Sequence, residues 1–137
     1  MLHRLSLFLL LILSISLTFT SAAPIPPHHS SYYPYKPVEL TTHFRGSVVP
    51  AQTSVQIAWT GGSGQGYEVY YIPQWPGQKT YAPVDIARTS GNSVTWQTPS
   101  IDRWPEGTTF IVGVNDVLEG SGSSWYALTR LLNFVAS

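Results

Sequence analysis

Aromatic side chains are the residues of this chain best suited to binding, because their flat apolar rings also carry polar edges. Tyr70, Trp75 and Tyr81 follow one another in a short stretch, and Trp104 stands in a later loop. Exposed rings of this kind make a flat amphipathic surface that meets a sugar ring or a partner protein. We therefore take Tyr70, Trp75, Tyr81 and Trp104 as the candidate ligand-binding residues. The alternative is that Trp75 and Trp104 plug the two open ends of a small β-domain.

Carboxylates and histidines are placed too loosely to predict catalysis. Asp102 with Glu106, and Asp116 with Glu119, are three or four residues apart in Gly- or Pro-containing segments, where acids are ordinarily solvated turn residues. His43 is the only histidine of the predicted domain, and no serine stands in a Gly-x-Ser-x-Gly context. We expect no catalytic residues and no enzyme activity. A small secreted hydrolase is the alternative, and it requires a nucleophile, a base and an oxyanion donor that converge in one pocket.

Metal ligands are equally sparse, so we expect no cofactor and no metal. The chain has no cysteine, which excludes thiolate sites and disulfides. His28 and His29 are adjacent but lack a third ligand nearby. Asp116 with Asn115 and Glu119 supplies oxygen atoms of the kind that calcium prefers, but without EF-hand spacing. Stability must therefore come from packing.

The overall composition favours strands and a neutral surface. Seven Lys and Arg balance seven Asp and Glu, and only 10% of the 137 residues are charged. Such a chain has no positive electrostatic potential that would attract nucleic acid or anionic lipid, so we expect neither partner. The 13% aromatic residues, 11 Gly and 11 Pro are typical of a turn-rich chain with bulky β-formers.

The first 38 residues have the pattern of an export signal followed by a proline-rich linker. Residues 1–22 have a basic start, an apolar run from Leu5 to Phe19 and small residues before Ala23, which predicts a cleavable signal peptide and a secreted protein. The run is shorter than the ~20 residues that span a membrane, so we expect no membrane segment after cleavage. Residues 23–38 are rich in proline without a hydrophobic period, which predicts a disordered lead. Residues 39–137 then form one domain.

Within this domain, short alternating segments are separated by turn residues every ~8–12 positions, as in a sandwich or barrel. In residues 54–60 the alternation puts Val55, Ile57 and Trp59 on one face, and we assign Trp59 and Trp96 to the core. The predicted strands cover residues 39–45, 54–60, 67–72, 84–89, 93–98, 108–116 and 125–134.

These strands are expected to pair mainly with their neighbours in sequence. Residues 54–72 predict one hairpin across the glycine-rich turn, and residues 84–98 predict a second. Pro73 and Pro76 are expected to interrupt pairing, and Val48–Pro50 to lead toward the next strand. The predicted fold is therefore all-β: a small antiparallel immunoglobulin/fibronectin-like β-sandwich of about seven strands.

Three short motifs occur in order in the domain: IAWTGG at 57–62, GNSVTW at 91–96 and PEGTTF at 105–110. With Asn115-Asp116 before a glycine-containing turn, they resemble a domain of small fungal secreted and cell-wall-associated proteins, over roughly residues 40–134. The resemblance implies an immunoglobulin-like β-sandwich exported to the cell surface or wall. Members of that family mostly lack an assigned activity, so the resemblance implies no catalytic residues.

The chain departs from the family pattern in two places. Residues 63–66 read SGQG where related domains often have a Pro-rich turn, and no Ser/Thr-rich stalk or membrane anchor follows the domain. We therefore expect a freely released or non-covalently wall-held protein.

The expected function is a secreted, extracellular or wall-associated structural or interaction module. The alternative is a carbohydrate-binding module or secreted effector that uses the exposed aromatics. Its partners would be cell-wall polysaccharide or a surface protein, and the sequence leaves the oligomeric state open.

Overall fold

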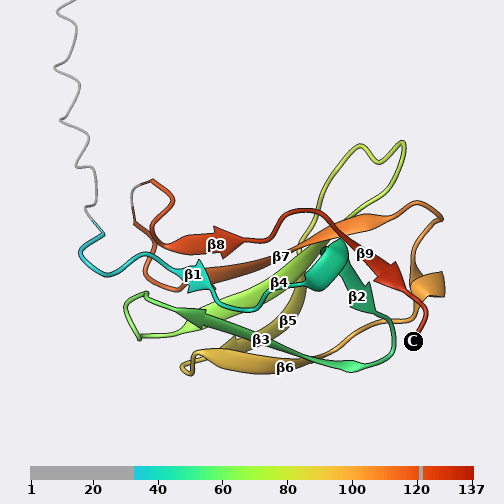
Figure 1. Ribbon diagram of the computed structural model, residues 1–137. Helices are drawn as coiled ribbons and strands as arrows, with labels where there is room; N and C mark the ends of the chain where they lie inside the picture. Colours follow the sequence, from blue (N-terminus) through green and yellow to red (C-terminus); the bar gives the residue numbers. More distant parts are fainter. Residues whose placement is uncertain (1–32, 121) are drawn as a thin grey trace, which may run out of the picture.

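The computed structural model describes residues 33–120 and 122–137, and this part of the chain is all-β (Figure 1). The predicted signal peptide and most of the predicted lead lie outside the described residues. None of the described helices is long and apolar enough to cross a membrane. The elements are β1 Glu39–Leu40, η1 Arg45–Ser47, β2 Val48–Pro50, β3 Ser54–Thr60, β4 Tyr67–Gln74, β5 Val84–Thr89, β6 Ser93–Gln97, η2 Ile101–Arg103, β7 Thr109–Asp116, β8 Tyr126–Leu128 and β9 Leu132–Val135.

The strands form two sheets that face each other across one core (Figure 1). The smaller sheet has the order β1-β3-β6, and the larger has the order β2-β9-β7-β4-β5 with β8 beside β7. All pairs are antiparallel except β2 with β9, which are parallel. The prediction of an all-β fold is confirmed, and the purely antiparallel arrangement is corrected by the β2–β9 pair.

Side-chain alternation explains how each strand faces the core. Ile57 and Trp59 of β3 are buried, as the period-two pattern predicted. Val69 and Tyr71 of β4 are buried by the same alternation. Trp59 meets Tyr67 edge-on, with ring centroids 5.2 Å apart, which joins the two sheets. Trp96 is also in the core, as expected.

Both predicted hairpins are wrong. Residues 54–60 pair with β6 and β1, whereas β4 pairs with β5 and β7, so the chain changes sheets between β3 and β4 and again between β5 and β6. Gly61, Gly62, Gly64 and Gly66 all have positive φ, which lets the connection leave the first sheet instead of closing a tight turn. Alternation determines which face of a strand is buried, but not which strand lies beside it.

Three strand boundaries also differ from the prediction. The strand expected at 39–45 is shorter than predicted. Only Glu39–Leu40 forms a strand, β1, because the chain leaves the smaller sheet after Leu40. Pro73 does not interrupt β4 but pairs with Phe110, at a point beyond the last β5 partner of that strand, Tyr71. The closing strand at 125–134 divides into β8 and β9.

Residues 33–38, which the sequence assigned to the disordered lead, pack against the domain. Tyr33 and Val38 are buried. The Val38 N–H donates to the Ser124 carbonyl (2.8 Å), and the Gly62 N–H donates to the Lys36 carbonyl (2.8 Å). We call residues 33–38 the N-terminal strap, because they tie the β3–β4 connection to the segment after β7.

Candidate functional site

Trp75 and Trp104 lie together at one end of the domain. Their rings stack, with centroids 5.8 Å apart and an interplanar angle of 22°. Tyr71 meets Trp104 edge-on at 6.2 Å, and the Arg103 guanidinium lies 5.5 Å from the Trp104 ring centre. The expectation that the two tryptophans plug opposite ends is therefore wrong, because both belong to the same end.

Tyr70 lies on the opposite face of the larger sheet from this stack. Its hydroxyl donates to Asn115 Oδ1 (2.9 Å), and its ring covers Gly113, where any side chain would collide with it. Burial raises the pKa of Tyr70, and the hydrogen bond to Asn115 opposes that rise. Tyr70 points away from the core because it alternates with the buried Val69 and Tyr71, but it is half-covered and does not lie on the same face as Trp75.

Tyr81 stands in the loop that joins β4 to β5 and projects from the domain (Figure 1). The side chain is 60% exposed. Gln78 braces this loop, because its side chain accepts from the Trp75 N–H (3.0 Å) and donates to the Thr80 carbonyl (2.8 Å). Of the four candidate residues, the structure thus brings Trp75 and Trp104 together and leaves Tyr70 on another face.

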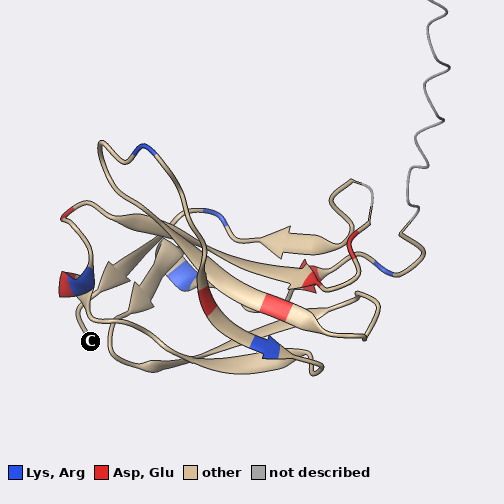
Figure 2. Ribbon diagram, turned by 180° about the vertical axis from the view of Figure 1, so that it is seen from behind, with Lys and Arg blue, Asp and Glu red and all other residues tan. Residues whose placement is uncertain are grey.

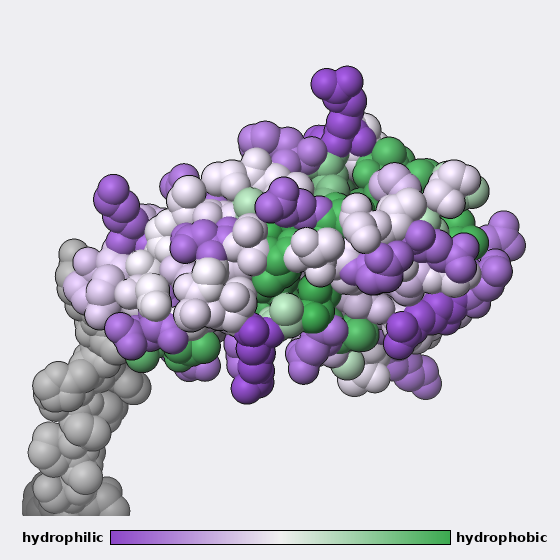
Figure 3. All heavy atoms as spheres, turned by 90° about the horizontal axis from the view of Figure 1, so that it is seen from below, coloured by the Kyte–Doolittle hydropathy of each residue, from purple (hydrophilic) through white to green (hydrophobic). Residues whose placement is uncertain are grey.

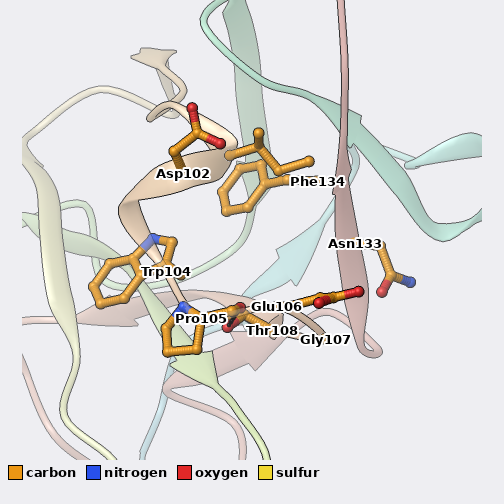
Figure 4. Close-up of a pocket in the computed structure, with 9 residues that line it drawn as sticks. Asp102, Trp104, Pro105, Glu106, Gly107, Thr108, Asn133 and Phe134 are labelled. Carbon is orange, nitrogen blue, oxygen red and sulfur yellow. Dashed lines mark hydrogen bonds between the residues drawn. The ribbon is translucent and has the colours of Figure 1, made fainter.

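A hollow of about 400 Å³ lies beside Trp104 (Figure 4). We call it the Trp104 hollow. Its apolar walls are aromatic and proline rings, and its polar groups are two carboxylates, an amide and a hydroxyl. The lining residues are Ile101, Asp102, Trp104, Pro105, Glu106, Gly107, Thr108, Asn133 and Phe134.

The chain around the hollow is shaped by local hydrogen bonds. The Arg103 N–H donates to the Ser100 carbonyl (3.2 Å), which forms η2. The Thr108 N–H (3.2 Å) and hydroxyl (2.6 Å) both donate to the Pro105 carbonyl, across a turn in which Gly107 has φ +77°. The carboxylates of Asp102 and Glu106 are therefore carried on two short turns of defined shape rather than on a loose loop.

The polar groups of the hollow are suited to binding hydroxyl groups. Asp102 and Glu106 are both exposed, and their carboxylate oxygens accept hydrogen bonds.

The described residues contain no cluster of three or more side chains that could hold a metal ion. Charged positions are few and spread over the domain (Figure 2).

A groove of mixed polarity opens where the two sheets part between β5 and β6. It has a volume of about 440 Å³, and its lining residues are Tyr71, Val84, Asp85, Ile86, Thr95, Trp96, Gln97, Pro99 and Arg103. Figure 3 views the molecule from below and shows apolar atoms exposed between hydrophilic ones. Tyr71 and Trp96 are nearly inaccessible, so they form the walls of this groove rather than platforms on it.

Asp116 has a role that the sequence did not predict. It is buried and accepts hydrogen bonds from the Tyr33 hydroxyl (2.8 Å), the Ser63 hydroxyl (2.7 Å), the Leu118 N–H (2.9 Å) and the Ser63 N–H. We call this cluster the Asp116 lock. Leu118 is a local donor two positions away, but Tyr33 and Ser63 lie 83 and 53 positions earlier, so spacing along the chain carried no signal for these two contacts.

Hydrogen bonding decides the ionisation of this carboxylate. Burial alone would raise the pKa of Asp116, but the donors on Ser63, Leu118 and Tyr33 hold it below its ordinary value. Conversely, burial and then the hydrogen bond to Asp116 raise the pKa of Tyr33 well above its ordinary value. Asp116 is thus a charged, fully partnered structural residue, not an open calcium ligand.

Comparison with models of known protein families finds no match to this chain, and comparison with curated protein sequences finds no relative.

Proposed function

We propose that this chain is a secreted, non-catalytic interaction module that binds a carbohydrate of the extracellular surface or wall in the Trp104 hollow. The observation that supports this proposal is the make-up of that hollow, in which an indole ring stands beside exposed carboxylates, an amide and a hydroxyl. Sugar rings present an apolar face and a fringe of hydroxyls, which match such a wall and such acceptors.

The order of the strands supports an immunoglobulin-like reading of the fold. In that fold, the second strand lies between the first and fifth in one sheet, and the sixth lies between the third and seventh in the other. Here β3 lies between β1 and β6, and β7 lies between β4 and β9. The early segment also joins both sheets, through β1 and β2. With the signal-like segment 1–22, this favours an exported binding domain.

A hydrolase is the second candidate, because Asp102 and Glu106 line the same hollow and glycosidases use two carboxylates. Both side chains are exposed to water. A glycosidase needs one carboxylic acid in shielded surroundings to protonate the leaving group. Binding without cleavage therefore fits the hollow better.

A pull-down on insoluble glucan and chitin tests the proposal. The protein expressed from its full sequence in a secreting host is compared with an Asp102→Asn/Glu106→Gln variant and a matched Glu39→Gln/Glu119→Gln control. All four residues are exposed, so circular dichroism should show that each protein is folded. We expect the parent and the control to bind one of the polysaccharides, and the hollow variant to bind at least about tenfold more weakly, since charge-assisted hydrogen bonds are lost.

The other outcomes would indicate a different binding site or a different function. Equal binding by all three proteins would move the site away from the Trp104 hollow. No depletion by any polysaccharide would contradict the carbohydrate proposal and leave a protein-binding module. Release of reducing sugar by the parent but not by the hollow variant would establish the hydrolase instead.

A further inference from the structure

We propose that another hollow of this domain binds an anionic amphiphile, a hydrocarbon chain that carries a carboxylate. It lies between the chain that leaves β1 and the link from β8 to β9, and its volume is about 380 Å³. This volume falls in the range of small-molecule sites, ~300–1,000 Å³. We call it the Leu132 hollow. The inference goes beyond the proposed function, because it concerns a different surface and a different class of ligand.

The hollow exists because the chain changes sheets at this point. β1 pairs with β3 in the smaller sheet, and β2 pairs with β9 in the larger one, so residues 41–47 must cross from sheet to sheet. β1 also lies next to β8 (Figure 1), and Leu40 of β1 and Leu128 of β8 both line the hollow. The space is therefore a product of the topology and not of one side-chain conformation.

Hydrogen bonds to core strands hold both walls in place. On one wall the Thr42 hydroxyl donates to the Gln56 carbonyl (3.2 Å) and accepts from the Ala58 N–H (2.8 Å). On the other wall the Thr129 N–H donates to the Val112 carbonyl (2.9 Å), and its hydroxyl accepts from the Val112 N–H (2.9 Å). A ligand would thus meet a largely preformed site, which lowers the entropic cost of binding.

Apolar side chains make up half of the residues that line the hollow. Leu40 and Phe44 come from the crossing segment, and Leu132 comes from β9. Leu128, from the end of β8, also lines the hollow and is 47% exposed. Such exposed apolar surface is what a hydrocarbon chain would remove from water.

The one charged side chain that lines this hollow, Arg130, favours an anion. Arg130 and His43 line the hollow and are exposed. The one ion pair among the described residues joins Arg88 to Glu68, so Arg130 has no carboxylate within 4.0 Å there. No Asp or Glu occurs between residues 40 and 60 or after Glu119, and Glu39 alternates to the opposite side of β1 from Leu40. A cationic rim over a leucine-rich floor is complementary to a carboxylate head on an apolar tail.

Titrations with three eight-carbon probes test this inference. Octanoate, octanol and octyltrimethylammonium are added to the ¹⁵N-labelled full-sequence protein from a secreting host, at neutral pH, and amide shifts are followed. We expect octanoate to shift the amides of residues 42–44 and 128–132 and to bind about tenfold more tightly than octanol. The cationic probe should bind more weakly than both.

Substitutions then separate the head site from the tail site. Arg130→Gln should bring octanoate down to the affinity of octanol without changing octanol binding, and Leu128→Gln should weaken both. Arg88→Gln, at an exposed arginine on β5, is the matched control and should change neither. Equal affinity of octanoate and octanol for the parent, absence of shifts, or shifts centred on residues 101–108 would overturn the proposal. The polysaccharide pull-down is unaffected by any of these results, so the two proposals fail independently.

Discussion

The two ends of the β4–β7 strand pair are closed in opposite ways. At the Asp116 end, a buried carboxylate gathers donors from the N-terminal strap, the β3–β4 connection and the segment after β7. At the Trp104 end, closure comes from stacked aromatic rings, and the indole N–H of Trp104 is buried without a partner among the described residues. One end uses its polar groups internally, whereas the other leaves carboxylates at the surface.

This difference indicates at which end a ligand can bind with little loss of folding stability. A fully partnered buried charge is costly to disturb, because every donor left behind is then unsatisfied. Stacked rings depend mainly on contact area and tolerate a ligand at their edge. We therefore locate stability in the Asp116 lock and propose binding at the Trp104 end, and the following predictions rank the contributions of the two ends to stability.

Asp116→Ala should have the largest effect. It removes the acceptor of four hydrogen bonds and leaves a buried donor on Tyr33 and half-buried donors on Ser63, so we expect a loss of about 3 kcal/mol or more in the free energy of unfolding. Urea denaturation measures the change, and Glu119→Ala, at an exposed acid, is the control. A loss of stability no larger than that of the control would show that the Asp116 lock does not stabilise the fold.

Trp75→Ala should cost about 2 kcal/mol, because the ring is partly exposed and its loss removes one stacked pair and some buried area. Tyr81→Ala, in the same loop, should stay within about 0.5 kcal/mol. The same urea titration compares them. If Trp75→Ala proved more damaging than Asp116→Ala, the ranking of the two ends would be reversed.

Tyr33→Phe should cost about 1 kcal/mol, because the ring remains against Gly120 and only one donor to Asp116 is lost. Tyr35→Phe, at an exposed tyrosine of the same strap, is the matched control and should change stability by a few tenths of a kcal/mol at most. Equal values for the two variants would mean that the strap does not depend on the lock.

Acid should weaken the Asp116 end selectively. The folded-state pKa of Asp116 lies below its ordinary 3.8, so the unfolded chain takes up this proton first. The contribution of Asp116 is therefore complete above that value and is lost as pH falls through the lower folded pKa. Urea midpoints measured from about pH 5 downward should show this loss in the parent and less of it in Asp116→Asn. An identical pH dependence of both proteins would contradict the assignment.

Local patterns in the sequence predicted the positions of most strands and the buried face of β3, but not every strand boundary. Alternation and side-chain size decide burial locally, and they place Trp59, Val69, Tyr71 and Trp96 in the core. Strand pairing was not predictable in the same way, since the glycine-rich segment 61–66 is compatible with either a tight turn or a change of sheet.

The candidate site was only partly accessible from sequence. Trp75 and Trp104 are far apart in the chain, and their stacking depends on the end of β4 meeting the turn before β7. Asn133, from β9, completes the Trp104 hollow. The Asp116 lock needs Tyr33, 83 positions earlier, and no local pattern connects two such residues.

The separation of Tyr33 and Asp116 also sets an order of events during synthesis. The strap is among the earliest parts of the domain to be made, whereas Asp116, Gly120 and Ser124, which receive it, are made near the end. Chains emerge N-terminus first, and contacts between distant segments form slowly because a long loop must close. Tyr33 therefore stays without its acceptor until the 83 positions that separate it from Asp116 have been synthesised, and its docking is a late step in folding of the domain.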